Sequence, residues 1–195
     1  MTDFTILLFD GFETLDAMGP AEIIGILPDH FRLRFCSRNG GFVESAQGAK
    51  VDTLSFSAVA PGGIILIPGG VGTRALIRDD AYIAAVRSLA QDSQYTLTVC
   101  TGAMVLAKTG LLDGREATTN KLLFDMVTSV TQNVRWRRQA RWVVDGKYYT
   151  SSGVTAGMDM ALGFVRDVIG EETAKTTARH IEYIWNGDRE SDPFA

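Results

Sequence analysis

Short apolar or alternating runs follow one another along this chain, separated by longer segments whose apolar residues recur every three or four positions. The short runs are typical of buried strands, and the longer period is typical of helices with one buried face. The predicted strands are residues 4–9, 31–35, 63–67, 96–99 and 116–119. The predicted helices are residues 15–27, 80–93, 102–108, 122–130, 155–169 and 171–185. This alternation predicts an α/β fold, with a mainly parallel sheet and helices on both of its faces.

Two stretches predict antiparallel pairs instead. Residues 43–46 and 50–53 follow two glycines and read as a small β-hairpin appended to the sheet. Asp145-Gly146 lies between the apolar runs 141–144 and 148–150, and a two-residue Asp-Gly turn is a strong hairpin signal. No linker, repeat or low-complexity segment interrupts the pattern, so we expect a single domain over residues 1–195, with a polar, extended tail from residue 187.

Composition narrows the class of protein. The chain has 195 residues, of which 46% are hydrophobic, and a net charge of −4, which argues against general nucleic-acid binding. Two cysteines make no disulfide framework and indicate a reducing compartment. The amino terminus lacks the basic region of a signal peptide, and no run approaches the ~20 apolar residues of a membrane helix. We therefore expect a cytoplasmic protein with no membrane partner.

The carboxyl ends of parallel strands are where such sheets bind ligands. Here the predicted strands end at Phe9, Ile67, Val99 and Thr119. The segments that follow these four ends are therefore expected to meet in one pocket. They are residues 10–16, 68–72 and 100–102, together with Asn120.

Cys100 lies where the predicted strand 96–99 passes into the helix 102–108. Small neighbours, Thr101 and Gly102, permit a sharp bend, as in the turn that exposes a serine nucleophile in G-x-S-x-G motifs. The N-terminus of the following helix favours a thiolate, so we expect its dipole to ionise Cys100. The alternative is a small buried cysteine that only packs.

A thiol nucleophile also needs a proton carrier and donors for developing negative charge. Backbone N–H groups of Gly69, Gly70 and Thr101 are candidate donors, although residues 69–72 also fit an ordinary turn. Asp16, between apolar neighbours at a helix start, is the candidate acid, with a pKa raised by burial. Its alternative role is a helix N-terminal charge or cap.

The remaining candidates read as structural. His30 lies beside a turn and His180 on the face of the last helix, so neither is expected at the pocket. Two histidines and two cysteines leave little for a zinc site. A carboxylate site for a hard cation stays an alternative, although no EF-hand spacing is present. Cys36 reads as a packing residue in a strand, and Met158 and Met160 as core. The basic and aromatic residues 135–142 read as a solvated hairpin or subunit contact.

Several motifs resemble one known family. Ile65-Leu66-Ile67-Pro68-Gly69-Gly70 and Thr98-Val99-Cys100-Thr101-Gly102-Ala103 resemble the ThiJ/PfpI superfamily, which has a class I glutamine amidotransferase-like fold. Leu15-Asp16-Ala17-Met18-Gly19-Pro20, Ala117-Thr118-Thr119 and the segment 153–159 are most similar to the isocyanide hydratase branch. The resemblance spans nearly the whole chain.

The resemblance implies a three-layer flavodoxin-like sandwich, a homodimer, a small-molecule substrate and no cofactor. It makes Cys100 the nucleophile on a strained elbow and Asp16 the general acid/base. It places the N–H groups of Gly70, Thr101 and Val154 near the sulfur or the bound intermediate, and it places Asn120 and Thr155 in the pocket.

The implied reaction is hydration of a small isocyanide, through a Cys100 thioimidate, to an N-substituted formamide. Asn120 stands where related proteins often carry histidine, which makes peptidase, deglycase and glyoxalase activities less expected. Two further alternatives are a thiol-based redox sensor or ligand-binding module, and a hydrolase of small amides or esters. The same pattern occurs in AraC-type regulators, but no helix-turn-helix is predicted after residue 185, so a complete regulator is not expected.

Overall fold

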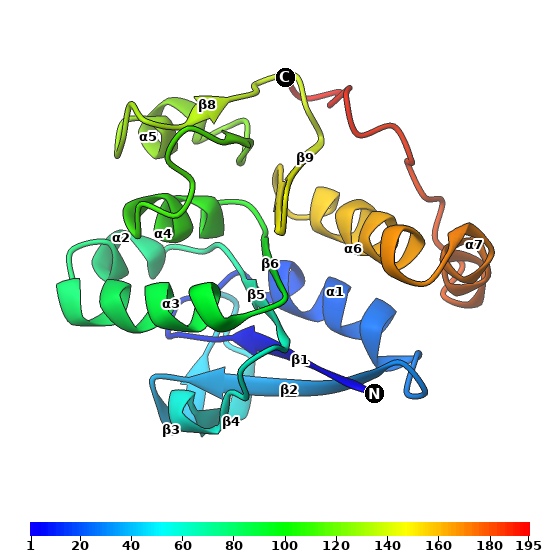
Figure 1. Ribbon diagram of the computed structural model, residues 1–195, viewed down its shortest axis with the longest axis horizontal. Coiled ribbons are helices and arrows are strands. Elements are labelled where there is room, and N and C mark those ends of the chain that lie inside the picture. Colours follow the sequence, from blue (N-terminus) through cyan, green and yellow to red (C-terminus); the bar gives the residue numbers. More distant parts are fainter.

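One eight-stranded sheet, in the order β3-β4-β2-β1-β5-β6-β10-β9, runs through the computed structural model, which describes residues 1–195 (Figure 1). Its central strands are parallel: β1 (Thr2–Leu7), β2 (Phe31–Ser37), β5 (Ile64–Ile67), β6 (Tyr95–Thr98) and β10 (Tyr148–Ser151). The apolar runs predict a strand at or close to the positions of β1, β2, β5 and β6. The carboxyl ends of β1, β5 and β6 therefore lie side by side.

Antiparallel pairs extend the sheet at both edges, as the turn signals predict. β3 (Asn39–Glu44) and β4 (Lys50–Ser55) form the small hairpin beside β2. At the other edge, β9 (Trp142–Asp145) turns through Gly146 into β10. The mainly parallel sheet with an appended hairpin is thus confirmed.

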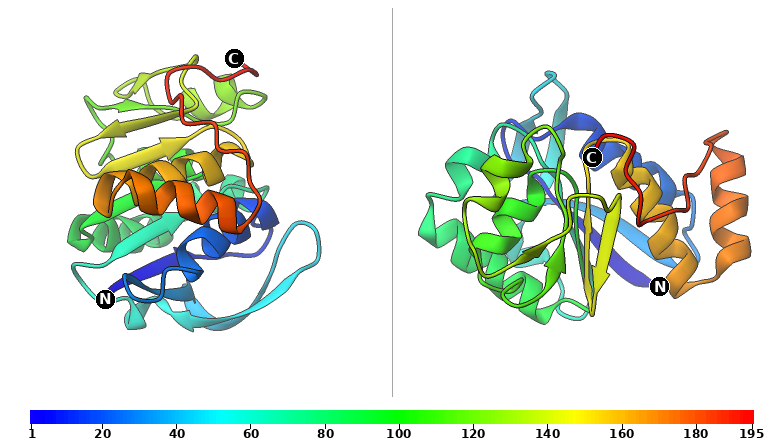
Figure 2. Two further views of the ribbon diagram at one scale, coloured as in Figure 1. Left: turned by 90° about the vertical axis from the view of Figure 1, so that its right-hand side faces the viewer. Right: turned by 90° about the horizontal axis from the view of Figure 1, so that it is seen from above.

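Helices cover both faces of this sheet, which gives three layers (Figure 2). One face carries α1 (Thr14–Gly25), α6 (Ala156–Val168) and α7 (Glu171–His180), with α7 packed outside α6. The other carries α2 (Thr73–Leu76), α3 (Asp80–Asp92), α4 (Gly102–Lys108) and α5 (Phe124–Thr128). A short 3-10 turn, η1 (Phe56–Ala58), follows the hairpin. The predicted three-layer flavodoxin-like sandwich is confirmed. No helix here is both long and apolar enough to cross a membrane.

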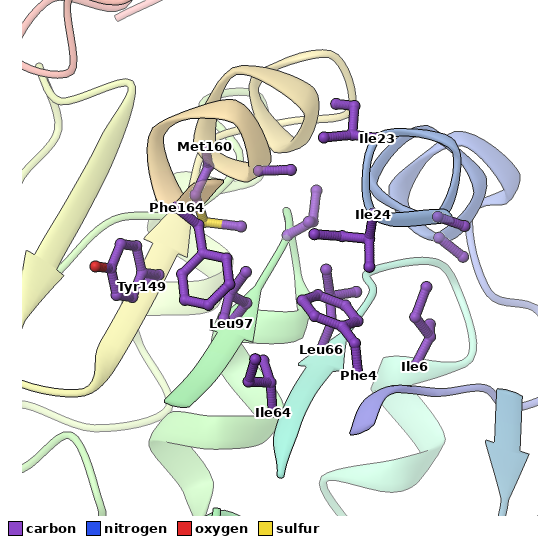
Figure 3. Packing of buried hydrophobic residues seen from close by; sticks show 14 of the residues in the cluster. Phe4, Ile6, Ile23, Ile24, Ile64, Leu66, Leu97, Tyr149, Met160 and Phe164 are labelled. Atoms are coloured by element: carbon purple, nitrogen blue, oxygen red, sulfur yellow. The ribbon is translucent and has the colours of Figure 1, made fainter. Parts of the chain in front are cut away.

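The buried strand β5 explains why its sequence is apolar at every position. Ile64 and Leu66 face the core beneath α1 and α6, whereas Ile65 and Ile67 face the core beneath α3 and α4. Figure 3 shows the first of these cores, where Phe164 of α6 points onto the sheet and packs against Tyr149 of β10. Met160 is fully buried and Met158 packs at the edge of the same cluster, so both belong to the core as predicted.

Residues 116–119 do not form a strand of the main sheet, so that prediction is wrong. Only β7 (Glu116–Ala117) is extended, and it pairs with β8 (Arg135–Trp136) in a separate two-stranded sheet. The reason is that side-chain hydroxyls replace strand pairing after Ala117. The Thr150 hydroxyl accepts from the Thr118 N–H (2.9 Å), and the Thr119 hydroxyl donates to the carbonyl of Cys100 (2.8 Å).

The predicted helix 171–185 ends early, at His180. Glu182 has a positive φ of 51°, and the Tyr183 N–H returns to the carbonyl of Ala178, which closes the helix. The chain then crosses back over α6 and β9 as a tail without regular structure (Figure 1).

A buried ion pair fastens this tail to the body of the protein. Arg141 Nε donates to Asp159 Oδ2 (2.6 Å), and both side chains are buried. Asp159 Oδ1 also accepts from the Tyr183 hydroxyl and from the Asn186 N–H, each at 3.0 Å. Because Asp159 lies in the first turn of α6, the clamp of Arg141, Asp159, Tyr183 and Asn186 fixes the end of α6 that faces Cys100.

The basic residues near β8 are paired with carboxylates. Arg137 contacts Glu116 and Glu190, and Arg138 contacts Asp125. The segment therefore presents ion pairs rather than an uncompensated positive surface.

Removing one partner of the buried clamp is expected to destabilise the protein strongly. Asp159→Asn leaves the Arg141 guanidinium without its main counter-charge and lowers the free energy of unfolding by about 3 kcal/mol. Denaturant unfolding measures the loss. Lys175→Ala, which breaks the exposed pair with Glu171, is the control and changes the unfolding midpoint little. Equal effects of the two substitutions would contradict the structural role of the clamp.

Candidate active site

Cys100 lies on a strained turn between β6 and α4. Its φ is +55°, a left-handed conformation that costs free energy for a residue with a side chain. The Cys100 N–H donates to Ser152, and the Gly102 N–H to Val99, which holds the turn. Gly102 must lack a side chain, because a Cβ there would lie 2.2 Å from the carbonyl oxygen of Ile67. The strand-to-helix turn that the sequence predicts is present.

Asp16 reaches this turn from the first turn of α1. Its side chain is fully buried, and Oδ2 accepts a hydrogen bond from the Gly69 N–H at 2.9 Å. The other oxygen, Oδ1, is buried and accepts no hydrogen bond from the protein. Asp16 therefore does not cap its own helix; its carboxyl is turned toward the loop after β5.

Gly69 is the point around which these groups meet. A Cβ at Gly69 would lie 2.7 Å from Asp16 Oδ2, 2.7 Å from the Thr101 nitrogen and 2.8 Å from Cys100 Cβ. No real side chain tolerates such contacts. The absence of a side chain at Gly69 is what lets the carboxyl, the thiol and the start of α4 come together.

Burial determines the protonation state of the Asp16 carboxyl and of the Cys100 thiol. It raises the pKa of Asp16 to about 7, against the Gly69 hydrogen bond, which lowers it. Burial, with the nearby Asp16 charge, also raises the pKa of Cys100 to about 12. The expected net lowering of the Cys100 pKa is therefore wrong: the N–H at the helix end lowers the pKa, but desolvation of the sulfur outweighs it. A protonated thiol beside an ionisable carboxyl is the resting arrangement at neutral pH.

Three groups nevertheless favour negative charge on the sulfur. Hydrogen bonding from the Thr101 N–H, the Asn120 side chain and the Val154 N–H each lowers the pKa of Cys100. Asn120 is held in place because its Oδ1 accepts from the Leu123 N–H at 2.9 Å, which leaves its Nδ2 as the donor. Val154 has a φ of +38° and lies immediately before α6.

Two predicted backbone donors are engaged elsewhere. The Gly69 N–H donates to Asp16, and the Gly70 N–H donates to the Thr101 hydroxyl at 3.0 Å. Their role as free donors for an oxyanion is thus corrected: Gly69 positions the carboxyl, and Gly70 positions Thr101.

The sulfur opens into a hollow of about 150 Å³. Its polar floor comes from residues that the sequence analysis singled out, Cys100, Thr101, Asn120, Val154 and Gly70. Its remaining walls are Glu13, Val71, Arg74, Leu122 and Leu123. Glu13 and Val71 lie in the segments 10–16 and 68–72 that the sequence analysis expected at the pocket. It did not identify Arg74, Leu122 and Leu123, although they follow these segments or Asn120 closely in the sequence.

Thr155 lies in an adjoining hollow rather than beside the sulfur. That second hollow, of about 270 Å³, shares Asn120, Leu122 and Val154 with the first and is also lined by Lys121 and by Phe194 of the tail. Thr155 therefore belongs to the surroundings of the site and does not line its deepest part.

The other titratable candidates lie away from the hollow. His30 is exposed near the amino end of β1, and His180 is exposed at the end of α7. Cys36 is fully buried in β2. No group of three or more His, Cys, Asp or Glu side chains is placed to hold a metal ion.

The chain is similar to known proteins both in sequence and in structure. The model of the DJ-1/PfpI family matches residues 3–167. The chain is 32% identical to isonitrile hydratase of Pseudomonas putida over 178 residues, 91% of this chain and 76% of that protein. It is 26% identical to deglycase TK1284 of Thermococcus kodakarensis over 149 residues, 75% of this chain and 87% of that protein.

Among solved structures, a THiJ/PfpI family protein from Pseudomonas syringae superposes with a TM-score of 0.84 at 25% identity, covering 95% of this chain and 76% of that one. The fold, the extent of the family match and the relative at 32% identity agree. This chain belongs to the DJ-1/PfpI family.

Proposed function

We propose that this protein hydrates a small isocyanide to an N-substituted formamide, with Cys100 as nucleophile and Asp16 as proton carrier. The observation that supports this most is the enclosure of one thiol and one carboxyl around Gly69, with no imidazole lining the hollow. A relative named isonitrile hydratase, at 32% identity, supports the same reaction.

The first step needs a nucleophile and a proton at one carbon. The terminal carbon of an isocyanide accepts the sulfur and then becomes basic, so it must also receive a proton. Asp16, with a pKa near neutrality, takes the proton from the Cys100 thiol as the S–C bond forms and delivers it to that carbon. Thiol and isocyanide thus combine into a thioimidate, R–N=CH–S–Cys100, without net gain or loss of protons.

The second step uses water. Asp16 accepts a proton from a water molecule that attacks the thioimidate carbon, and passes this proton to the nitrogen. The resulting tetrahedral adduct collapses by breaking the C–S bond and gives R–NH–CHO and the free thiol. The N–H groups of Thr101 and Val154, with the Asn120 amide, stabilise the departing thiolate until it regains its proton.

The alternatives fit the site less well. A redox sensor needs a thiolate at neutral pH, whereas burial raises the pKa of this thiol. A hydrolase of amides or esters needs an acid for the leaving group, which an imidazole usually supplies. Members of this family are commonly dimers that act on small molecules, and we infer that this chain is a homodimer as well.

Substitution at either member of the pair is expected to abolish turnover. Cys100→Ala removes the attacking atom, and Asp16→Asn removes the proton carrier, which is worth about 10²–10⁴ in rate. Formation of the formamide from an aryl isocyanide, followed by proton NMR, measures the loss. Cys36→Ala is the matched control, because Cys36 is buried in a strand away from the hollow. Formamide production by Cys100→Ala at the wild-type rate would rule out the mechanism.

Burial of Asp16 is expected to cost stability above pH 7. Its pKa in the folded protein lies above the unfolded value of 3.8, so the folded state binds more protons between these values and stability falls as pH rises through this range. Asp16→Asn removes this cost. It is expected to be more stable than wild type at pH 8 by up to about 4 kcal/mol, with the difference shrinking toward pH 4.

Urea unfolding at a series of pH values measures this difference. Asp52→Asn, at an exposed carboxyl of the hairpin, is the control and should show no such pH-dependent gain. A difference between Asp16→Asn and wild type that stays constant from pH 4 to pH 8 would contradict a raised pKa at Asp16.

A further inference from the structure

Arg74 is the one cationic side chain that lines the hollow of Cys100. Its guanidinium is exposed and has no partner in the protein, a property it shares only with Arg78 and Arg179. Every other arginine contacts a carboxylate or a carbonyl through its side chain. Arg74, on the short helix α2, thus brings an unpaired guanidinium to the hollow that Cys100 lines.

The one acidic side chain that lines the hollow is hydrogen-bonded to a neutral amide and not to Arg74. Glu13 also lines it, but Glu13 Oε1 accepts from Gln47 Nε2 (2.8 Å), which belongs to the turn of the β3–β4 hairpin. No ion pair joins Glu13 to Arg74. The guanidinium of Arg74 therefore keeps its donors available to a molecule that enters the hollow.

Apolar side chains line the hollow together with Arg74 and Cys100. Val71 and Leu122 are 56% and 90% exposed, which is unusual for such side chains, and Leu123 lies beside them. A molecule that covers these side chains gains from removing them from water. The hollow thus combines a thiol, exposed apolar side chains and a free cation.

We propose that Arg74 selects substrates that carry a carboxylate, placed a short apolar spacer away from the electrophilic carbon. A guanidinium matches a carboxylate with two parallel hydrogen bonds, which fixes orientation as well as position. The identity of the electrophile as an isocyanide rests on the proposed function. The charge preference rests on Arg74 alone and is tested separately.

The first test uses two thiol reagents of nearly equal size, iodoacetate and iodoacetamide. Each forms an S–C bond at Cys100 and releases iodide, with the thiol proton passing to Asp16 or to the buffer. Peptide mass spectrometry gives the alkylation rate at Cys100, and the iodoacetate/iodoacetamide ratio is divided by that of a free cysteine derivative. Arg74→Gln is expected to lower this ratio about fivefold.

Two matched variants test whether the charge of Arg74 causes the preference for iodoacetate. Arg74→Lys keeps the charge and is expected to keep most of the preference. Arg78→Gln removes an unpaired arginine outside the hollow and should leave the ratio unchanged. Added salt should lower the wild-type ratio but not that of Arg74→Gln, because screening acts on the charge–charge interaction.

The second test compares isocyanoacetate with its neutral methyl ester as substrates. Arg74→Gln is expected to raise KM for isocyanoacetate more than it lowers kcat, since the contact is remote from the reacting carbon. Hydration of both isocyanides with the same selectivity in wild type and Arg74→Gln would overturn this inference and leave the proposed function standing.

The two experiments also distinguish the reverse case, in which the charge preference holds and the hydratase function fails. An Arg74-dependent alkylation ratio without hydration of either isocyanide would support the charge preference and reject the hydratase function. If neither reagent modifies Cys100 and neither isocyanide is hydrated, the hollow does not admit small molecules to the sulfur, and both proposals are rejected.

Discussion

The close approach of three chain segments at Gly69 is the constraint on which the site depends. The start of α1, the loop after β5 and the turn before α4 converge at a point where no Cβ fits. The backbone of Gly69 also supplies the N–H that holds the Asp16 carboxyl. Because the parallel strands β1, β5 and β6 end side by side, the fold delivers these segments to one edge, and the missing side chain lets them touch.

The same close approach also determines the pKa values of Asp16 and Cys100. Excluding water from Asp16 and Cys100 raises the pKa of both, so near neutral pH the thiol keeps its proton while the carboxyl beside it titrates. A short helix such as α4 contributes N–H groups but cannot overcome the desolvation of a sulfur that is almost fully buried. The chemistry therefore fits proton exchange within the pair better than a permanently ionised thiolate.

Sequence patterns were sufficient to predict the elements in which every residue is buried. The run Ile64–Ile67 is apolar at every position because both faces are covered, and this could be recognised without coordinates. The pattern failed at Thr118 and Thr119, where hydroxyl groups bond to distant backbone atoms, and after His180, where a positive φ ends the helix. Arg74 could not be identified either, because whether an arginine is paired depends on tertiary neighbours that sequence spacing does not encode.

The clamp between Arg141 and Asp159 also governs how this protein should be handled. It brings the tail back over the start of α6, so that Phe194 borders the hollow that adjoins Cys100, whereas the amino terminus enters β1 at the far end of the sheet (Figure 1). Any polypeptide joined after Ala195 would leave the molecule beside the entrance to the site. An affinity tag or reporter fused to the amino terminus would leave that entrance open.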